Sequence, residues 1–262
     1  MTTLEIGRPA LAVVDMQNDF VDPEAGSYAI GAEKMVTRIG RVISAARRAG
    51  IPIIYSQEIH RSDGLDGGRL LWDGRSGWVT GRHPRALPGE PPTPPCLEGS
   101  DGVAIVEELR PEPQDIRILK RRFSIFFSTE LDMHLRHLAI DTLIIVGVCT
   151  DVCVLWTTGD AYQRDYKVCV LEDCVAGTSE SAHSAALTII RALTNSGVTI
   201  NAAEVIEALD QLSEWFHDGD EFQAAAQGHT EELSHDITES PCPRCETPTL
   251  VGMGIARHFN KE

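Results

Sequence analysis

The chain contains 262 residues, of which 42% are hydrophobic, and it carries a formal net charge of −16. This length and apolar content are enough for one large buried core and exclude a disordered chain. The negative charge argues against nucleic-acid partners, because contacts to phosphates need a basic surface. The longest apolar runs are far shorter than the roughly 18 residues of a membrane span, and the N-terminus lacks a signal pattern. We therefore expect a cytoplasmic protein without membrane partners.

Short apolar segments alternate with helical patterns over the first 213 residues. Six segments are rich in β-branched residues and nearly continuously apolar, as strands covered on both faces are: 11–15, 51–56, 116–120, 142–148, 167–173 and 198–201. Helical periodicity marks the segments 33–50, 129–138, 151–164, 180–196 and 202–213. This alternation predicts an α/β fold: a doubly wound, Rossmann-like sheet of about six parallel strands with helices on both faces.

Two regions depart from the alternation. Residues 57–100 contain DGLDGG, DGRSG and PGEPPTPP, which are too rich in glycine and proline for an ordinary connection. Either a disordered insert or a lid over a site would explain them, and Trp72 and Trp78 favour the lid. Residues 214–262 lose the alternation and form an acidic C-terminal extension, since residues 204–262 carry 13 acidic and 3 basic side chains. We therefore expect a main domain of residues 1–213 followed by this extension.

The seven cysteines form an odd set without the pattern of a disulfide-rich secreted protein, so we expect reduced thiols. Cys242 and Cys245 have the spacing of a zinc-binding pair, but one pair supplies only two of four ligands. His235, His258 or a second subunit could complete such a site. The alternative is a flexible tail with two free thiols.

Polar residues follow three of the predicted strands, at the edge of a parallel sheet where ligands bind. Asp15 follows LAVV, Lys120 follows IRIL, and the turn from Cys149 to Cys153 follows TLIIVGV. Each of these residues alone is more often structural: an aspartate caps a helix, a lysine lies on the surface, and a cysteine fills a core. Their combination at one edge is what points to chemistry.

Three longer stretches carry a family resemblance. VVDMQNDF at 13–20, KRRFSIFFSTEL at 120–131 and GVCTDVCVLWTTGDA at 147–161 resemble the signature motifs of the isochorismatase-like cysteine hydrolases. That family includes nicotinamidases, N-carbamoylsarcosine amidases, ureidoacrylate amidohydrolases and biuret hydrolases. The resemblance covers roughly residues 9–210, with the motifs in the order and spacing of the family.

The resemblance implies a catalytic triad of Asp15, Lys120 and Cys153, and it leaves Cys149 a structural role. It also implies a non-proline cis peptide at Val148–Cys149, in a turn where Val148, Cys149 and Cys153 would form the oxyanion hole. If a helix begins near Thr150, Cys153 lies in its first turn, and the helix dipole and Lys120 are expected to lower the pKa of its thiol. True isochorismatases, which cleave a vinyl ether, lack this cysteine, so Cys153 favours carbon–nitrogen hydrolysis.

The candidate substrate-binding residues are mostly aromatic: Phe20, His60, Trp72, Trp78, Phe123 and Trp156. Core packing is an equally good interpretation of Phe20 and Phe123. Arg61 and Arg69, like His60, could pair with a substrate carboxylate, although solvated surface is the simpler interpretation of a loop this charged.

We expect no metal and no cofactor. Nicotinamidases bind a metal through Asp-x-His and a later histidine, and here Glu58, His60 and His83 would occupy those places. The glutamate departs from that pattern, so a pocket-lining or strand-capping His60 is the simpler interpretation.

The sequence thus predicts a cysteine-dependent amidohydrolase that cleaves a small ureido, carbamoyl or amide compound through a thioester and releases ammonia or an amine. The alternatives are a nicotinamidase-like, metal-assisted amidase and a non-catalytic member that serves binding or assembly. The expected partners are a small-molecule substrate and further copies of the chain in a homo-oligomer.

Overall fold

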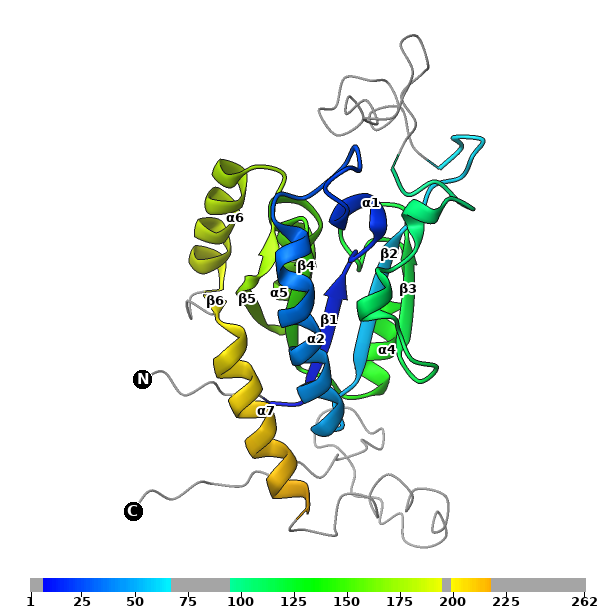
Figure 1. Ribbon diagram of the computed structural model, residues 1–262. Helices are drawn as coiled ribbons and strands as arrows, with labels where there is room; N and C mark the ends of the chain where they lie inside the picture. Colours follow the sequence, from blue (N-terminus) through cyan, green and yellow to red (C-terminus); the bar gives the residue numbers. More distant parts are fainter. Residues whose placement is uncertain (1–6, 67–94, 195–198, 218–262) are drawn as a thin grey trace, which may run out of the picture. The chain divides into compact units, whose positions relative to one another are not determined.

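A computed structural model describes residues 7–66, 95–194 and 199–217, without the side chains of 199–200 and 212–217. Its centre is a sheet in which all pairings are parallel and the strand order is β3-β2-β1-β4-β5-β6 (Figure 1). The strands are β1 (Pro9–Val14), β2 (Ile53–Glu58), β3 (Ile116–Lys120), β4 (Thr142–Val148), β5 (Lys167–Ala176) and β6 (Thr199–Ile200).

Helices cover both faces of the sheet. They are α1 (Asn18–Val21), α2 (Ala32–Arg48), α4 (Leu131–His137), α5 (Leu155–Tyr162), α6 (Glu180–Leu193) and α7 (Ala202–His217). In the view of Figure 1, α2 and α7 lie in front of the sheet, while α4 and α5 lie behind it. The expected α/β fold class is therefore confirmed.

Burial explains why the strand sequences are so apolar. Every residue of β1, β2 and β4 is buried, because these strands have neighbours on both sides and helices on both faces. The edge strand β3 alternates instead: Ile118 and Lys120 are buried, whereas Arg117 and Leu119 are exposed. Lys120 therefore points into the protein and not to solvent.

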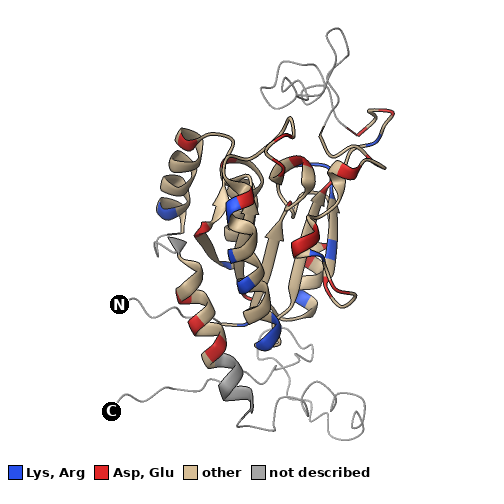
Figure 2. Cartoon of the chain, in the orientation of Figure 1, with Lys and Arg blue, Asp and Glu red and all other residues tan. Residues whose placement is uncertain are grey.

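Helix α2 packs through the apolar stripe that the sequence predicts, with Ile39, Ile43 and Ala46 buried. It ends before Gly50, which has a φ of +65° as a glycine that follows a helix often does. Figure 2 shows basic residues near the end of α2 and acidic residues along α7. Arg48 of α2 and Asp210 of α7 form an ion pair of 2.7 Å, which joins the two helices.

The structure corrects several predicted boundaries. β2 lies two residues later than predicted and ends at Glu58. The sixth strand is a two-residue pairing beside β5, so five strands make up nearly all of the sheet. The predicted helix 151–164 begins as a π-helical turn, Thr150–Val154, before α5. The last helix continues to His217, beyond the predicted end at 213.

Parts of the two irregular regions lie outside the described residues. These parts include Arg69, Trp72, Trp78, His83, Cys242 and Cys245, so the predictions about the lid, the tail and the domain boundary stay predictions. Within the described part, Cys96, Cys149, Cys153, Cys169 and Cys174 are all free thiols. None of the helices in that part is both long and apolar enough to cross a membrane.

Candidate active site

Four neighbouring strands bring the candidate residues to one edge of the sheet. Lys120 ends β3, Glu58 ends β2 directly beside it, and Asp15 follows β1. The turn with Cys153 follows β4, the next strand in the sheet. The order of the strands reverses between β1 and β4, and such switch points are where ligands bind in open α/β sheets.

Asp15 and Lys120 form the buried centre of this cluster. Lys120 Nζ lies 2.7 Å from Asp15 Oδ2, and neither side chain is accessible to solvent. The Ser56 hydroxyl donates to the other oxygen, Asp15 Oδ1, at 2.6 Å and accepts the Asp15 backbone N–H at 3.2 Å. Asp15 has a φ of +49°, a left-handed conformation that aspartate tolerates better than most residues.

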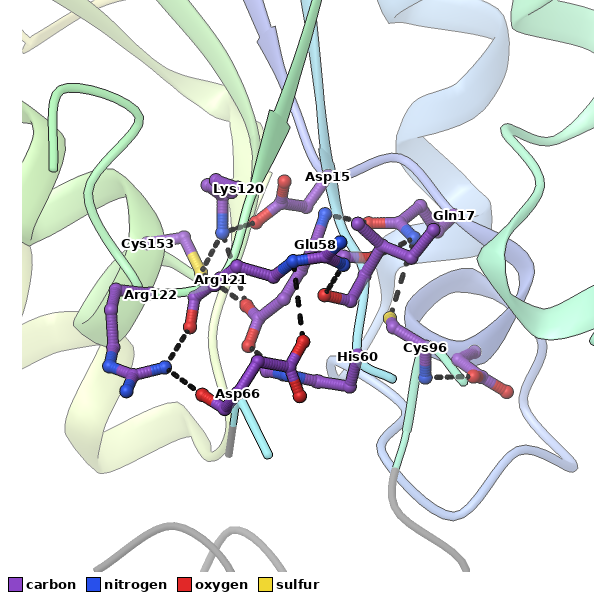
Figure 3. A network of polar contacts seen from close by, with 12 residues as sticks. Asp15, Gln17, Glu58, His60, Asp66, Cys96, Lys120, Arg121, Arg122 and Cys153 are labelled. Carbon is purple, nitrogen blue, oxygen red and sulfur yellow. Dashed lines mark hydrogen bonds and ion pairs between the residues drawn. The ribbon is translucent and has the colours of Figure 1, made fainter. Parts of the chain in front are cut away.

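Glu58 and Cys153 complete the cluster, and all four side chains point toward one another in Figure 3. Lys120 Nζ donates to Glu58 Oε2 at 3.1 Å and lies 3.5 Å from Cys153 Sγ. The Cys153 thiol donates to the same Glu58 oxygen at 3.7 Å. Cys153 is 1% exposed, so its sulfur lies within the protein and next to the ammonium.

The turn that carries Cys153 follows directly on β4. The Val148–Cys149 peptide bond is cis, as the family resemblance implies, and this prediction is confirmed. The backbone N–H groups of Val152 and Val154 both donate to the carbonyl of Cys149 at 3.0 Å. The bond from Val154 spans five residues and closes the π-helical turn, a form of helix that often occurs at functional sites. Cys153 lies on this turn with its sulfur next to Lys120 and Glu58.

The connection between β5 and α6 holds this turn from outside. Asp151 accepts the backbone N–H of Thr178 at 2.8 Å and its hydroxyl at 2.5 Å. The Thr150 hydroxyl lies 2.9 Å from His183 Nδ1 of α6. Two successive residues of the turn are thus fixed by residues about 30 positions later in the chain.

The surroundings of the cluster shift the pKa values of its two carboxyl groups in opposite directions. Burial raises the pKa of Asp15, and Lys120 offsets this effect only in part. Burial also raises the pKa of Glu58, but Lys120 and His60 outweigh it and lower that pKa to about 2. Burial disfavours the Lys120 ammonium, yet the nearby Asp15 and Glu58 raise its pKa well above the usual range. Lys120 and Glu58 are therefore charged at neutral pH.

The expectation of a lowered thiol pKa is wrong for this structure. Burial raises the pKa of Cys153 well above its usual range, and Asp15 and Glu58 raise it further. Lys120 acts in the opposite direction, but one ammonium is outweighed by the lost hydration and two carboxylates. The surroundings of the sulfur therefore favour the neutral thiol over the thiolate. The same burial and its acidic neighbours also raise the pKa of Cys149.

The predicted substrate-binding residues occupy different surroundings. Phe20 is 1% exposed within the hydrophobic core, and Phe123 is partly buried against that core. His60 is buried beside Glu58, with its Nε2 3.0 Å from Glu58 Oε1. Trp156 is 59% exposed on α5, three residues after Cys153. The role of these side chains in substrate binding stays a prediction, as does that of Trp72 and Trp78.

The donor set in the described residues does not fit a metal ion. Oxygen and sulfur atoms of Asp15, Glu58 and Cys153 lie within 4.8 Å of one another. The Lys120 ammonium already contacts all three side chains and supplies the positive charge that a cation would bring. Glu58 and His60, two of the residues considered for a nicotinamidase-like site, bond to each other, and His83 lies outside the described residues.

Glu58 is the member of the cluster that sequence patterns do not single out. The apolar pattern ends the second strand at residue 56 and offers Glu58 only as a candidate metal ligand. The apolar run ends at Tyr55, but the strand continues through three buried polar residues, Ser56, Gln57 and Glu58. The polar stretch SQEIH directly after an apolar run was the available signal.

Comparisons with known proteins agree with this geometry. A model of the isochorismatase domain matches residues 9–204. The ureidoacrylate amidohydrolase RutB of Methylobacterium radiotolerans is 36% identical over 186 residues, which cover 68% of this chain and 70% of that protein. A crystal structure of an isochorismatase family protein from Desulfovibrio vulgaris aligns with a TM-score of 0.65 and 30% identity, over 78% of this chain and 98% of the other.

N-carbamoylsarcosine amidase from Thermoplasma acidophilum is also similar, with a TM-score of 0.58 and 30% identity over 74% of this chain and 96% of that protein. A parallel sheet with a buried cysteine, lysine and aspartate at its carboxyl edge defines the class, an α/β hydrolytic enzyme with a cysteine centre. The chain belongs to the isochorismatase-like cysteine hydrolase family. It is a hydrolase that acts on carbon–nitrogen bonds other than peptide bonds.

Proposed function

We propose that this protein hydrolyses a small ureido, carbamoyl or amide compound through a thioester on Cys153, with Asp15 and Lys120 as the other members of a triad. One observation carries the proposal: the Lys120 ammonium lies between a buried carboxylate and a buried thiol, 2.7 Å from Asp15 Oδ2 and 3.5 Å from Cys153 Sγ. Ureidoacrylate amidohydrolase and N-carbamoylsarcosine amidase, both similar to this chain, support the substrate class.

The first half of the reaction makes the thioester. Asp15 accepts the thiol proton of Cys153, and its raised pKa makes it a stronger base than an ordinary aspartate. The sulfur attacks the carbonyl carbon of the substrate and forms a tetrahedral intermediate. The carbon–nitrogen bond then breaks while Asp15 returns the proton to the leaving nitrogen, so that ammonia or an amine departs and a thioester remains.

The second half returns the enzyme to its resting state. Asp15 takes a proton from a water molecule, and the resulting hydroxide attacks the thioester carbon. The carbon–sulfur bond breaks, the acid product leaves, and the sulfur regains the proton held by Asp15. Lys120 remains charged in both halves and offsets the negative charge that moves between Asp15 and Cys153.

The turn after β4 supplies the polar groups for the carbonyl oxygen. Backbone amides of Cys149 and Cys153, in the turn that begins at the cis Val148–Cys149 bond, are our candidates for the oxyanion hole. Such donors are worth more in a site from which water is excluded, and the residues of this turn are almost all buried. We assign the choice of substrate to the loop 57–100 and to the exposed Trp156.

Ammonia release from a panel of ureas, N-carbamoyl amino acids, biuret and nicotinamide tests this function. We expect Cys153→Ala and Cys153→Ser to reduce turnover of any substrate by at least about 10⁴-fold, because the covalent step is lost, while circular dichroism shows an unchanged fold. Cys169→Ala, a change of another buried thiol on β5, is the matched control and should keep activity. Full activity in Cys153→Ala would rule out covalent catalysis by this residue, and loss on metal removal would favour the metal-assisted alternative.

A further inference from the structure

The Glu58 carboxylate has three neighbours that the proposed triad does not explain. One oxygen, Oε2, accepts from Lys120 Nζ at 3.1 Å and from the Cys153 thiol at 3.7 Å. The other oxygen, Oε1, lies 3.0 Å from His60 Nε2. Glu58 is 4% exposed, so its charge interacts with these groups with little screening by water.

His60 fixes the orientation of Glu58 and is itself held by its surroundings. Its Nδ1 lies 3.8 Å from Asp66 Oδ2, and Asp66 accepts the backbone N–H of Arg61 and forms an ion pair with Arg121 at 3.3 Å (Figure 3). Arg121 also donates to the backbone carbonyl of Ile59. These contacts join the segment after β2 to the segment after β3 and hold His60 in place. Glu58 therefore cannot turn away from Cys153 without breaking its own hydrogen bond to His60.

The groups around Cys153 favour its protonated form at rest. The sulfur faces Lys120 from β3, Asp15 after β1, Glu58 from β2 and Cys149 from its own turn. One ammonium thus faces two carboxyl groups, and only Glu58 is within hydrogen-bond distance of the thiol among the described carboxylates. A thiolate so close to an ionised, buried carboxylate would be repelled, whereas a thiol can donate to it.

We infer that Glu58, held in place by His60, is a positioning residue that keeps the resting Cys153 a neutral thiol whose hydrogen points to Glu58 Oε2. This inference rests on the proposed function and divides the work between two carboxyl groups. Asp15, whose pKa is raised, moves the proton, and Glu58, whose pKa is lowered, remains an anion. The attacking sulfur becomes a thiolate when its proton turns from Glu58 Oε2 toward Asp15 and is transferred from the sulfur to the Asp15 carboxylate during the reaction.

The pH dependence of Cys153 alkylation tests the inference directly. The rate constant for iodoacetamide is measured from pH 5 to pH 10 by peptide mapping, which separates Cys153 from the other thiols. Glu58→Gln removes one negative charge and nearly preserves shape, so the apparent pKa of alkylation should fall by at least about one unit. The rate constant of alkylation at pH 7 should then rise at least tenfold. The amide oxygen of the glutamine can still accept the thiol hydrogen, but more weakly than the carboxylate does.

Two further variants separate this effect from a structural one. Glu58→Asp retains the charge and should give a profile close to that of the wild type. Asp63→Asn removes an exposed carboxylate of the same segment, which pairs with Arg61 and does not face Cys153, and should leave the profile unchanged. The acid limb of the kcat/KM profile of Glu58→Gln should move to lower pH together with the alkylation profile. An unchanged or upward-shifted alkylation profile in Glu58→Gln would overturn the inference.

A measurement on the unaltered active site covers the case in which Glu58→Gln does not fold. Infrared spectra of the wild type and of Cys153→Ala at pH 7 should differ by one S–H stretching band, shifted to lower frequency by its hydrogen bond to a carboxylate. The absence of that band in the wild type would show a resting thiolate and would sink the inference. These results can be separated from the proposed function. The loss of turnover in Cys153→Ala tests whether the residue is needed for the reaction, whereas the S–H band tests only the protonation state of the wild-type thiol.

Discussion

Lys120 is the residue on which the charge balance of the cluster depends. Lys120→Ala would leave two carboxyl groups and a thiol together without a positive charge, so we expect the apparent pKa of Cys153 alkylation to rise and turnover to be lost. Removal of one partner from a buried ion pair typically destabilises a protein by about 3–5 kcal/mol. Urea unfolding and the pH profile of alkylation measure the two effects.

Two further lysine variants show whether the position of the charge matters. Lys120→Arg keeps the charge, but a forked guanidinium is larger than an ammonium and should restore activity poorly. Lys167→Ala removes an exposed lysine at the start of β5 and should change neither property. An alkylation profile that is unchanged in Lys120→Ala, with activity kept, would remove Lys120 from the proposed triad.

At the scale of single residues, the sequence predicted which side chains meet but not their protonation. Asp15, Lys120 and Cys153 could be found because each follows an apolar strand and matches a family motif. The raised pKa of Cys153 depends on its nearly complete burial and on the nearby Asp15 and Glu58, and none of these is visible in the local sequence around the cysteine. Local rules for reactive cysteines assume partial exposure, which is absent here.

At the scale of elements, Gly147 permits β1 and β4 to approach each other. It has a φ of +116°, and a Cβ atom there would lie 2.1 Å from the carbonyl oxygen of Val14. Because the clash is with backbone, Gly147→Ala should force the strands apart beside Asp15 and destabilise the protein by about 3 kcal/mol or more. Gly50→Ala, also at positive φ but with nothing within 4 Å of the added carbon, should cost only about 1–2 kcal/mol.

Urea unfolding compares the two glycine variants, and ammonia release reports the state of the site. We expect Gly147→Ala to lose activity even where it remains folded, because Asp15 and the turn after β4 would move relative to each other. Gly50→Ala should retain full activity. Equal losses of stability in the two variants would show that backbone conformation, and not the approach of the strands, is the reason for glycine at position 147.

The turn with Cys153 depends on its contacts to the segment before α6. Asp151→Ala removes two hydrogen bonds to Thr178, so we expect a loss of about 1–3 kcal/mol in stability. The turn also becomes freer, so kcat should fall at least tenfold with little change in KM. Thr178→Ser keeps both donors and is the matched control. An unchanged kcat in Asp151→Ala would mean that the turn holds its own shape.

The sequence predicts helices and strands well where burial is continuous along the segment. It predicts them poorly where contacts with distant parts of the chain determine the backbone conformation. The apolar strands β1 and β4 read clearly from the sequence, since both of their faces are covered. The helix predicted over 151–164 begins instead as a π-helical turn before α5, and the residues that contact this turn, Thr178 and His183, lie far along the chain. Local periodicity carries no information about such contacts.

At the scale of the whole molecule, strand order creates the site. Alternation of strands and helices predicts a parallel sheet, but it does not state that β3, β2, β1 and β4 are neighbours in that order. That order places the ends of four strands side by side and so brings Lys120, Glu58, Asp15 and Cys153 together. The family resemblance, and not the pattern of elements, supplied this part of the prediction. The homo-oligomer and the cytoplasmic location stay predictions.

The acidic C-terminal extension can be tested by shortening the chain. All described strands and helices lie between residues 9 and 217, as do Asp15, Glu58, Lys120 and Cys153, and the family model matches 9–204. We therefore expect a chain that ends at residue 217 to keep the melting temperature within about 2 °C and the turnover of the full chain. Differential scanning calorimetry and ammonia release make the comparison, and the Cys153→Ala form of the shortened chain sets the background rate. If Cys242 and Cys245 bind zinc, metal analysis should find it only in the full chain. A shortened chain that folds but loses turnover would assign the extension a role in the reaction, and one that fails to fold would make residues 1–217 an incomplete domain.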